Sequence, residues 1–296
     1  MSSPEPADAN SLDILEQAAA ISGIEFRNPQ LIRAGSNTIY RVGDIIGRIG
    51  KGGTTDVAVR ELRISQWLND SGLPAVRVAD VTNPIAVVDD RPITWWQRIP
   101  AHQAATPAEL ASTLRQLHAL APPATFALPE HEPFAGLRRV ITSTGRLDAE
   151  DRGWLLGHHD RLCNQFLELG RPRRKTVIHG DAWQGNVVVP FGGRPIIVDL
   201  ERVSLGRPEW DLIQVAADRT DFDRLSESDY LAFVDAYGDD VTMDFAFRLL
   251  ADIQELRWTV FALSLSTASA SAAGEVRHRV ACLQGEIVRP WRWNAL

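Results

Sequence analysis

Three polar residues that together could carry out phosphoryl transfer lie beside runs of β-forming residues. Asp181 follows His179 by two residues and precedes Asn186 by five, and Asp199 comes thirteen residues after Asn186, at the end of the apolar run 196–198. Phosphoryl transfer needs a carboxylate that orients the attacking hydroxyl and accepts its proton, and it needs hard oxygen ligands for Mg²⁺. We therefore predict that Asp181 is the catalytic base and that Asn186 and Asp199 bind Mg²⁺.

The spacing of this loop is more informative than its composition. Asp, Gly and Asn are most often turn formers, so the loop by itself is equally compatible with a plain turn. However, the pattern H-x-D-x-x-x-x-N is that of the kinase catalytic loop. The longer segments HGDAWQGNVVV (179–189) and IIVDLERVSLGRPEWDL (196–212) resemble the C-terminal signatures of the aminoglycoside phosphotransferase and choline kinase superfamily.

This resemblance implies an α+β, two-lobed, protein-kinase-like fold. An N-terminal lobe, residues 1–98, would bind the nucleotide on a small antiparallel sheet with one main helix. A mostly helical C-terminal lobe, residues 99–296, would carry the catalytic loop and bind the substrate. A cleft between two lobes is the expected place for a ligand site.

The resemblance also implies roles for residues around the loop. His179 and Asp211 would support the catalytic loop, although from the residues alone Asp211 is only an acid at a helix start. His118 stands on a predicted helix where the superfamily tends to carry Leu-His, and we take it as a structural histidine. Trp183, inside the loop, and Glu201 are predicted to line the acceptor pocket.

The resemblance extends more weakly to a nucleotide-covering hairpin, GSNTIYRV (35–42), for which a plain hairpin turn is the alternative. Its predicted nucleotide contacts are Gly35, Ser36 and Asn37. The strand that follows has Arg48 where the family has a lysine, but a permanently charged guanidinium still suits a phosphate. We predict that Arg48 contacts a phosphate and pairs with Glu61, with Lys51 as the competing phosphate ligand.

The segment TWWQRIP (94–100) matches the position of the hinge that holds the nucleotide base. Its backbone groups would pair with a purine, and an aromatic side chain would pack on the base. The predicted contacts are Trp96, Gln97 and Arg98. Packing in the core is the alternative for Trp95 and Trp96, because large aromatic side chains are usually buried.

Hydrophobic periodicity and turn residues predict the elements that position these groups. Helices are expected at 11–22, at 56–69 and from the capping box Thr106–Glu109 to about residue 120. Strands are expected within 31–49, at 85–88 and at 93–99. The β-forming runs 176–189 and 194–200 are expected to form a hairpin inside the helical lobe.

Composition narrows the function further. The net charge of −7 and the pI of about 5.5 argue against nucleic acid and anionic membranes as partners and favour a cationic or neutral substrate. Two distant cysteines, Cys163 and Cys282, lack metal-ligand spacing and indicate buried thiols of a reducing compartment. Since no leader or membrane-spanning run is evident, we expect a cytoplasmic protein. We expect it to be a monomer or a homodimer.

The leading hypothesis is a kinase that uses ATP or GTP with Mg²⁺ to phosphorylate a hydroxyl of a small molecule, such as an aminoglycoside or other antibiotic, an amino sugar or an amino alcohol. A protein kinase is disfavoured because Asp199-Leu200-Glu201 replaces D-F-G and no A-P-E segment follows. A metal hydrolase does not explain the D-x-x-x-x-N spacing. A nucleotide-binding pseudokinase without transferase activity would explain Arg48, and it remains the alternative.

Overall fold

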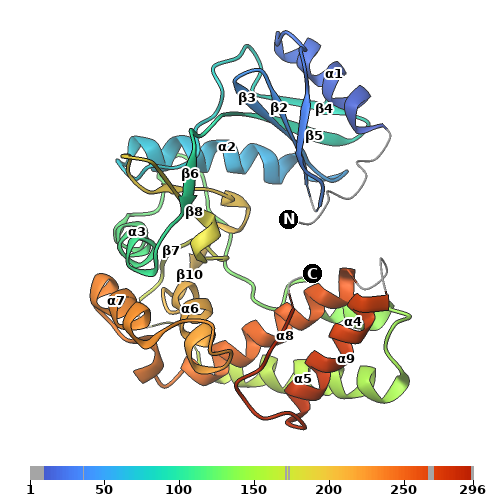
Figure 1. Cartoon of the computed structure of the whole chain (residues 1–296), viewed down its shortest axis with the longest axis vertical. Coiled ribbons are helices and arrows are strands. Elements are labelled where there is room, and N and C mark those ends of the chain that lie inside the picture. The colour runs from blue at the N-terminus through green and yellow to red at the C-terminus, as the bar shows by residue number, and fades with distance from the viewer. Residues whose placement is uncertain (1–9, 36, 171, 173, 266–269, 295–296) are drawn as a thin grey trace. The chain divides into compact units, whose positions relative to one another are not determined.

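The computed structural model describes residues 10–35, 37–170, 172, 174–265 and 270–294. Contacts within the chain group it into two compact units (Figure 1). Unit 1 comprises the chain up to Ala105 together with Gly185–Val203, and unit 2 comprises Thr106–Gln184 and the chain from Ser204 onwards. The chain therefore enters unit 1 a second time at Gly185, four residues after the predicted catalytic base Asp181.

Unit 1 is built on a five-stranded antiparallel sheet with the strand order β1-β2-β3-β5-β4. Its strands are β1 (Gln30–Arg33), β2 (Thr38–Val42), β3 (Ile45–Ile49), β4 (Ile85–Val88) and β5 (Arg91–Gln97). Val42 pairs with Ile45, so the turn between β2 and β3 has only two residues, and Gly43 there takes a φ of 60°. Such tight hairpins need positive φ, which explains the glycine.

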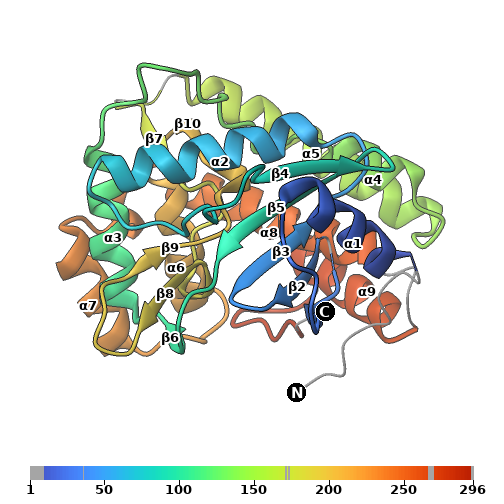
Figure 2. The same cartoon turned by 90° about the horizontal axis from the view of Figure 1, so that it is seen from above.

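Helices α1 (Ser11–Ser22) and α2 (Thr55–Asp70) lie on opposite faces of this sheet (Figure 2). A Cβ added to Gly47 of β3 would lie 2.8 Å from Leu15 of α1 and equally close to Trp95, so this face packs against α1. Successive residues of a strand point to opposite faces. Arg48 therefore points toward α2, the orientation that a pair with Glu61 requires.

A second sheet of unit 1 contains the β-hairpin that follows the predicted catalytic loop. It has the order β6-β8-β9 and consists of β6 (His102–Ala104), β8 (Val187–Pro190) and β9 (Ile196–Ile197). Ile197 donates to Pro74 O at 2.9 Å and accepts from Val76 N–H at 2.8 Å. These bonds tie the hairpin to the segment after α2, so its expected place in the helical lobe is wrong.

Unit 2 is mostly helical. Its helices are α3 (Pro107–Ala119), α4 (Leu137–Ser143), α5 (Ala149–Glu168), α6 (Trp210–Thr220), α7 (Glu227–Tyr237), α8 (Phe247–Leu265) and α9 (Ala270–Gln284). The predicted capping box is present, because Thr106 Oγ1 accepts from Glu109 N–H and the Glu109 carboxylate accepts from Thr106 N–H. No helix among the described residues is long and apolar enough to span a bilayer.

Two expectations need correction in unit 2. The run Thr176–Ile178 forms β7, which pairs with β10 (Ser204–Gly206) instead of joining the β8–β9 hairpin. Cys282 is buried as expected, whereas Cys163 is only partly buried. The remaining architecture, a small antiparallel sheet in one unit and a mostly helical second unit, is the α+β fold that the sequence predicts.

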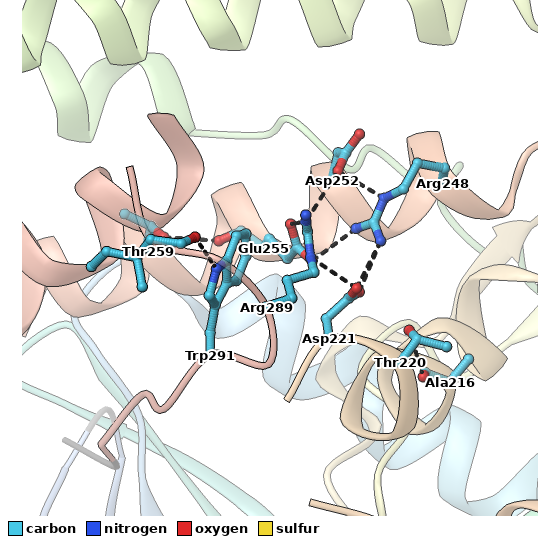
Figure 3. A network of polar contacts seen from close by, with 10 residues as sticks. Ala216, Thr220, Asp221, Arg248, Asp252, Glu255, Thr259, Arg289 and Trp291 are labelled. Carbon is cyan, nitrogen blue, oxygen red and sulfur yellow. Dashed lines mark hydrogen bonds and ion pairs between the residues drawn. The ribbon is translucent and has the colours of Figure 1, made fainter. Parts of the chain in front are cut away.

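A network of charges around two buried carboxylates, Asp221 and Glu255, fastens the C-terminal segment to α6 and α8 (Figure 3). Arg248 donates to both Asp221 oxygens at 2.9 Å, to Asp252 at 2.9 Å and to Glu255 at 2.8 Å. Arg289, beyond α9, bonds Asp221 at 2.9 Å and Glu255 at 3.0 Å. Three carboxylates thus share two guanidinium groups, and burial raises the pKa of Glu255 to about 8 against the opposing charges of Arg248 and Arg289.

This network predicts a pH-dependent stability. Between the ordinary glutamate pKa and about 8, folded Glu255 retains a proton that the unfolded chain has lost. The free energy of unfolding therefore falls as pH rises through this window, by up to about 1.4 kcal/mol per pH unit from this group. Glu255→Gln should remove that part of the slope in urea unfolding between pH 5 and pH 8.

Glu286→Gln is the control for this prediction, because Glu286 is an exposed glutamate after α9. Its slope of unfolding free energy against pH should equal that of the parent protein. A slope in Glu255→Gln that also equals the parent slope would show that Glu255 is ionised throughout the window.

Candidate active site

The predicted catalytic loop begins in unit 2, where Asp211 in the first turn of α6 holds its backbone. Asp211 is 1% exposed. Its Oδ2 accepts the N–H of His179 at 2.6 Å, and its Oδ1 accepts the N–H of Gly180 at 2.8 Å. A carboxylate that binds two successive backbone N–H groups fixes the peptides before Asp181 in one orientation. These two hydrogen bonds are the contacts expected of a residue that supports the loop, as predicted for Asp211.

His118 of α3 completes the surroundings of Asp211. Its Nε2 lies 3.0 Å from Asp211 Oδ2 and its Nδ1 lies 2.8 Å from the hydroxyl of Tyr237. Burial opposes ionisation of Asp211, but the bond and charge of His118, and then His179, hold the pKa of Asp211 below its usual range. Burial raises the pKa of the Tyr237 hydroxyl, which shares a hydrogen bond with Nδ1. His118 is structural, as expected, but its link to Asp211 was not foreseen.

Asp181 itself is partly buried. Its backbone N–H donates to Nδ1 of His179 at 3.3 Å, so this ring nitrogen is an acceptor. Two residues further on, the Trp183 side chain is 44% exposed, which leaves a large aromatic surface accessible beside the loop. The loop therefore presents a carboxylate and an indole from a backbone that unit 2 holds in place.

The two predicted metal ligands lie in unit 1, at the same end of the β8–β9 hairpin. Val187 pairs with Ile197, and the N–H of Val198 donates to Asn186 O at 3.0 Å. Asn186 is 7% exposed, whereas Asp199 is exposed and has a φ of 57°. Positive φ is unfavourable for an aspartate and is found mainly where the surroundings impose it.

This donor set fits Mg²⁺. The ion prefers hard oxygen ligands and is commonly bound by one or two protein side chains, with phosphate oxygens and water completing its octahedron. An amide oxygen from Asn186 and a carboxylate from Asp199 supply such a pair. Over the described ranges, no group of three or more His, Cys, Asp or Glu side chains could hold a metal ion.

Arg48 is held from three sides within unit 1. Its Nη1 donates to Glu61 of α2 at 2.7 Å and its Nη2 donates to Glu201 at 3.1 Å. With its amide oxygen turned toward the guanidinium, Asn37 accepts from Nη2 at 2.7 Å and from Nε at 3.1 Å. The predicted Arg48–Glu61 pair is thus present. Glu201, which we expected at the acceptor pocket, is also a partner of Arg48, and no sequence signal indicated this contact.

The carboxylates around Arg48 favour a permanent positive charge on its guanidinium group. Burial alone would lower the pKa of Arg48, but Glu61 and then Asp199 and Glu201 raise it above its usual range. Burial raises the pKa of Glu61 while Arg48 opposes that rise. The Glu61 side chain is 5% exposed and that of Glu201 is 43% exposed. Glu61 is therefore the fixed partner and Glu201 the one that solvent or a ligand can replace.

A cavity of about 100 Å³ lies next to Arg48 in unit 1. Its lining includes Asn37, Arg48, Lys51, Glu61 and Glu201. Both candidate phosphate ligands, the arginine and the lysine, thus face one cavity. Lys51 stands in the loop before α2, whereas Arg48 is fixed on a strand by its partners.

The remaining predicted nucleotide contacts fall at the hairpin and at the hinge. Gly35 is exposed before β2, and Ser36 lies outside the described residues. Trp96 is 5% exposed, while Gln97 and Arg98 are exposed at the end of β5. Trp95 is fully buried in the core between α1 and the sheet, which agrees with core packing for this residue, and Trp96 is also buried.

Comparison with known proteins agrees with this arrangement. The family model described as "Phosphotransferase enzyme family" matches residues 30–253. No curated protein sequence matches the chain.

Solved structures share the fold at low sequence identity. An amicoumacin kinase bound to AMP-PNP and Ca²⁺ has a TM-score of 0.72 and 12% identity, with 94% of each chain covered. A microcompartment-associated aminopropanol kinase has a TM-score of 0.73 and 16% identity, with 92% of this chain and 95% of that chain covered. An aminoglycoside phosphotransferase from Streptomyces rimosus has a TM-score of 0.59 and 21% identity, with 77% and 92% covered.

The family match covers most of the chain, including the catalytic loop, the β8–β9 hairpin and the start of α6. The solved structures have the same protein-kinase-like architecture as the two units described above. The chain therefore belongs to the phosphotransferase enzyme family, with the fold of aminoglycoside phosphotransferases and choline kinases.

Proposed function

We propose that this protein transfers the γ-phosphoryl group of ATP or GTP to a hydroxyl of a small molecule. The observation that carries the proposal is the Arg48–Glu61 pair at 2.7 Å, next to a cavity in the sheet-containing unit. A cation that binds phosphate must be held in place before the nucleotide arrives, and a buried carboxylate on a neighbouring helix does so. Unit 1 would thus bind the nucleotide, and unit 2 would bind the acceptor.

In this proposal each polar group has one task. Asp181 accepts a hydrogen bond from the acceptor hydroxyl, orients its oxygen and takes its proton as the phosphoryl group is transferred. Asn186 and Asp199 hold Mg²⁺, which when bound would offset charge on the phosphate oxygens. Arg48 donates to an α- or β-phosphate oxygen. Because four of its five N–H groups are engaged by Glu61, Glu201 and Asn37, we expect phosphate to replace the exposed Glu201.

The acceptor is expected to be cationic or neutral, because the chain has a net charge of −7. Two structural neighbours are an amicoumacin kinase and an aminopropanol kinase, which makes antibiotics and amino alcohols the first candidates. The exposed Trp183 offers an aromatic surface for such a ligand. A nucleotide-binding pseudokinase is the alternative. It would use the metal ligands Asn186 and Asp199 but has no need of a base, and Asp181 is retained.

Arg48→Ala should raise the KM for nucleotide by about ten- to hundredfold, since a charged hydrogen bond to phosphate contributes about 1.5–3 kcal/mol. Arg48→Lys should retain part of the affinity because the charge survives, although an ammonium cannot hold three partners in one plane. Lys51→Ala is the control from the same cavity, and steady-state kinetics should show little change. The opposite ranking of Arg48→Ala and Lys51→Ala would identify Lys51 as the phosphate ligand.

The metal roles are tested by nucleotide binding with and without Mg²⁺, measured by calorimetry. In the parent protein Mg²⁺ should increase affinity, and Asp199→Ala should remove most of that increase. Asp223→Ala is a matched control, because Asp223 is also an exposed aspartate with positive φ, 49° against 57° for Asp199, but lies after α6. If neither ATP nor GTP binds the parent protein in the presence of Mg²⁺, the proposed function is wrong.

The acceptor class is found by supplying aminoglycosides, other antibiotics, amino sugars and amino alcohols and measuring ADP or GDP release. We expect at least one acceptor to raise release well above the rate with water alone. Nucleotide binding together with release that no hydroxyl compound accelerates would favour the pseudokinase.

A further inference from the structure

The peptide that precedes Asp181 is held at its carbonyl by a residue with no assigned role. The indole Nε1 of Trp210, the first residue of α6, donates to the carbonyl of Gly180 at 3.2 Å. The next residue, Asp211, accepts the N–H of the same glycine at 2.8 Å. Two consecutive residues of α6 thus bind both polar groups of Gly180.

The indole is itself buried and packs against an aromatic ring and a guanidinium group. Trp210 is 5% exposed, the ring of His131 lies with its centroid 4.5 Å away, and the guanidinium of Arg257 lies 5.5 Å from the ring centre. Arg257 donates to Pro133 O at 2.6 Å, and His131 N–H donates to Leu205 O at 2.9 Å. The segment 131–133 therefore links the tryptophan to α8 and β10, and the indole N–H has a fixed direction.

Gly180 is the position where such a restraint matters. Its φ is 81°, a conformation that glycine adopts freely, so the residue itself does little to limit rotation of the next peptide. That peptide is planar and contains the Gly180 carbonyl and the Asp181 N–H. Its carbonyl is bound by Trp210, and its N–H is bound by His179 Nδ1 at 3.3 Å. Asp211, by contrast, binds the N–H groups of His179 and Gly180, which belong to the two preceding peptides.

We propose that Trp210 is a positioning residue for phosphoryl transfer, because its indole N–H fixes the Gly180–Asp181 peptide plane and so aims the Asp181 carboxylate. The inference rests on the proposed function for the role of Asp181. It adds a residue that acts through the backbone of the loop. A small displacement of a catalytic group is enough to cost a large factor in rate.

Trp210→Phe tests the proposal, since it removes the N–H and keeps an aromatic ring for His131 and Arg257. We expect kcat to fall by about tenfold or more, with the KM for nucleotide and the nucleotide affinity within about twofold of the parent. The loss of one neutral hydrogen bond should lower Tm by only a few degrees.

Trp291→Phe is the matched control (Figure 3). Trp291 is 3% exposed in the same unit, its indole donates to the carbonyl of Ile287 at 2.9 Å, and Arg289 lies 3.9 Å from its ring centre. The same chemical change made away from the catalytic loop should lower Tm comparably and leave kcat unchanged. Equal falls in kcat for the two variants, or a kcat of Trp210→Phe within twofold of the parent, would overturn the proposal.

Hydrogen exchange at the Asp181 amide separates this inference from the proposed function, because it needs no substrate. The exchange should be faster in Trp210→Phe than in the parent and unchanged in Trp291→Phe. Unchanged exchange in Trp210→Phe would refute the positioning role even if the protein is a kinase. Arg257→Gln leaves the indole in place but removes the cation beside it, so it should give a smaller increase in the exchange rate of the Asp181 amide. This variant replaces Trp210→Phe in the test if Trp210→Phe does not fold.

Discussion

Asp181→Asn should lower kcat by about 10²- to 10⁴-fold, the contribution of a positioned acid–base group. The amide can still accept a hydrogen bond from an acceptor hydroxyl, but it cannot take the proton. Nucleotide affinity should stay within about twofold of the parent, because Arg48 and the predicted metal ligands are unchanged. The measurement is steady-state ADP or GDP release with the best acceptor, together with calorimetric nucleotide binding.

Asp160→Asn is the control for this change, because Asp160 is an aspartate with an exposed side chain on α5. It should leave both kcat and nucleotide affinity unchanged. An Asp181→Asn protein with nearly full turnover would remove Asp181 from the role of base, whereas a parallel loss of nucleotide affinity would point to a metal ligand.

Asp211→Ala should produce the largest loss of stability, about 3–5 kcal/mol in the free energy of unfolding. Asp211 is 1% exposed, and its removal leaves the N–H groups of His179 and Gly180 and the Nε2 of His118 without their acceptor. Buried donors without partners are costly. Turnover should fall as strongly as in Asp181→Asn wherever the variant is still folded, since the same bonds orient the loop.

Asp218→Ala provides a comparison on the same helix. Its side chain is 22% exposed and its one ion pair, to Arg224, is 3.4 Å long, so we expect a loss of about 1 kcal/mol or less. The test is to measure the free energy of unfolding in urea at pH 7 for the parent protein, Asp211→Ala and Asp218→Ala. A similar loss for Asp211→Ala and Asp218→Ala would mean that the loop does not depend on Asp211.

Sequence reasoning succeeded where the signal is local. The capping box at Thr106 marks the start of α3, and the apolar spacing of α1 gives both of its ends, because helix boundaries depend on neighbours within one turn. The Arg48–Glu61 contact was also predicted, because the resemblance to the family implies a pair between a basic residue on this strand and a glutamate on the next helix.

The contacts that sequence reasoning missed join residues far apart in the chain. β7 pairs with β10, and nothing in the three residues Thr176–Ile178 distinguishes that partner from β8. Glu201 reaches Arg48 from 153 residues away. In the sequence, Trp210 was noted only as part of the segment PEWDL. Its position directly before Asp211 was a hint, because two consecutive residues in the first turn of a helix can both reach the same loop.

The most direct test of phosphoryl transfer follows the γ-phosphate itself, using radiolabelled ATP or GTP with Mg²⁺ and the acceptor that gives the fastest nucleotide turnover. The parent protein should transfer the label to the acceptor as a phosphate monoester, from which a phosphomonoesterase releases labelled inorganic phosphate. Asp181→Asn should transfer the label at least about a hundredfold more slowly. Label that appears only as inorganic phosphate, at the same rate with and without acceptor, would contradict transfer to a small-molecule hydroxyl.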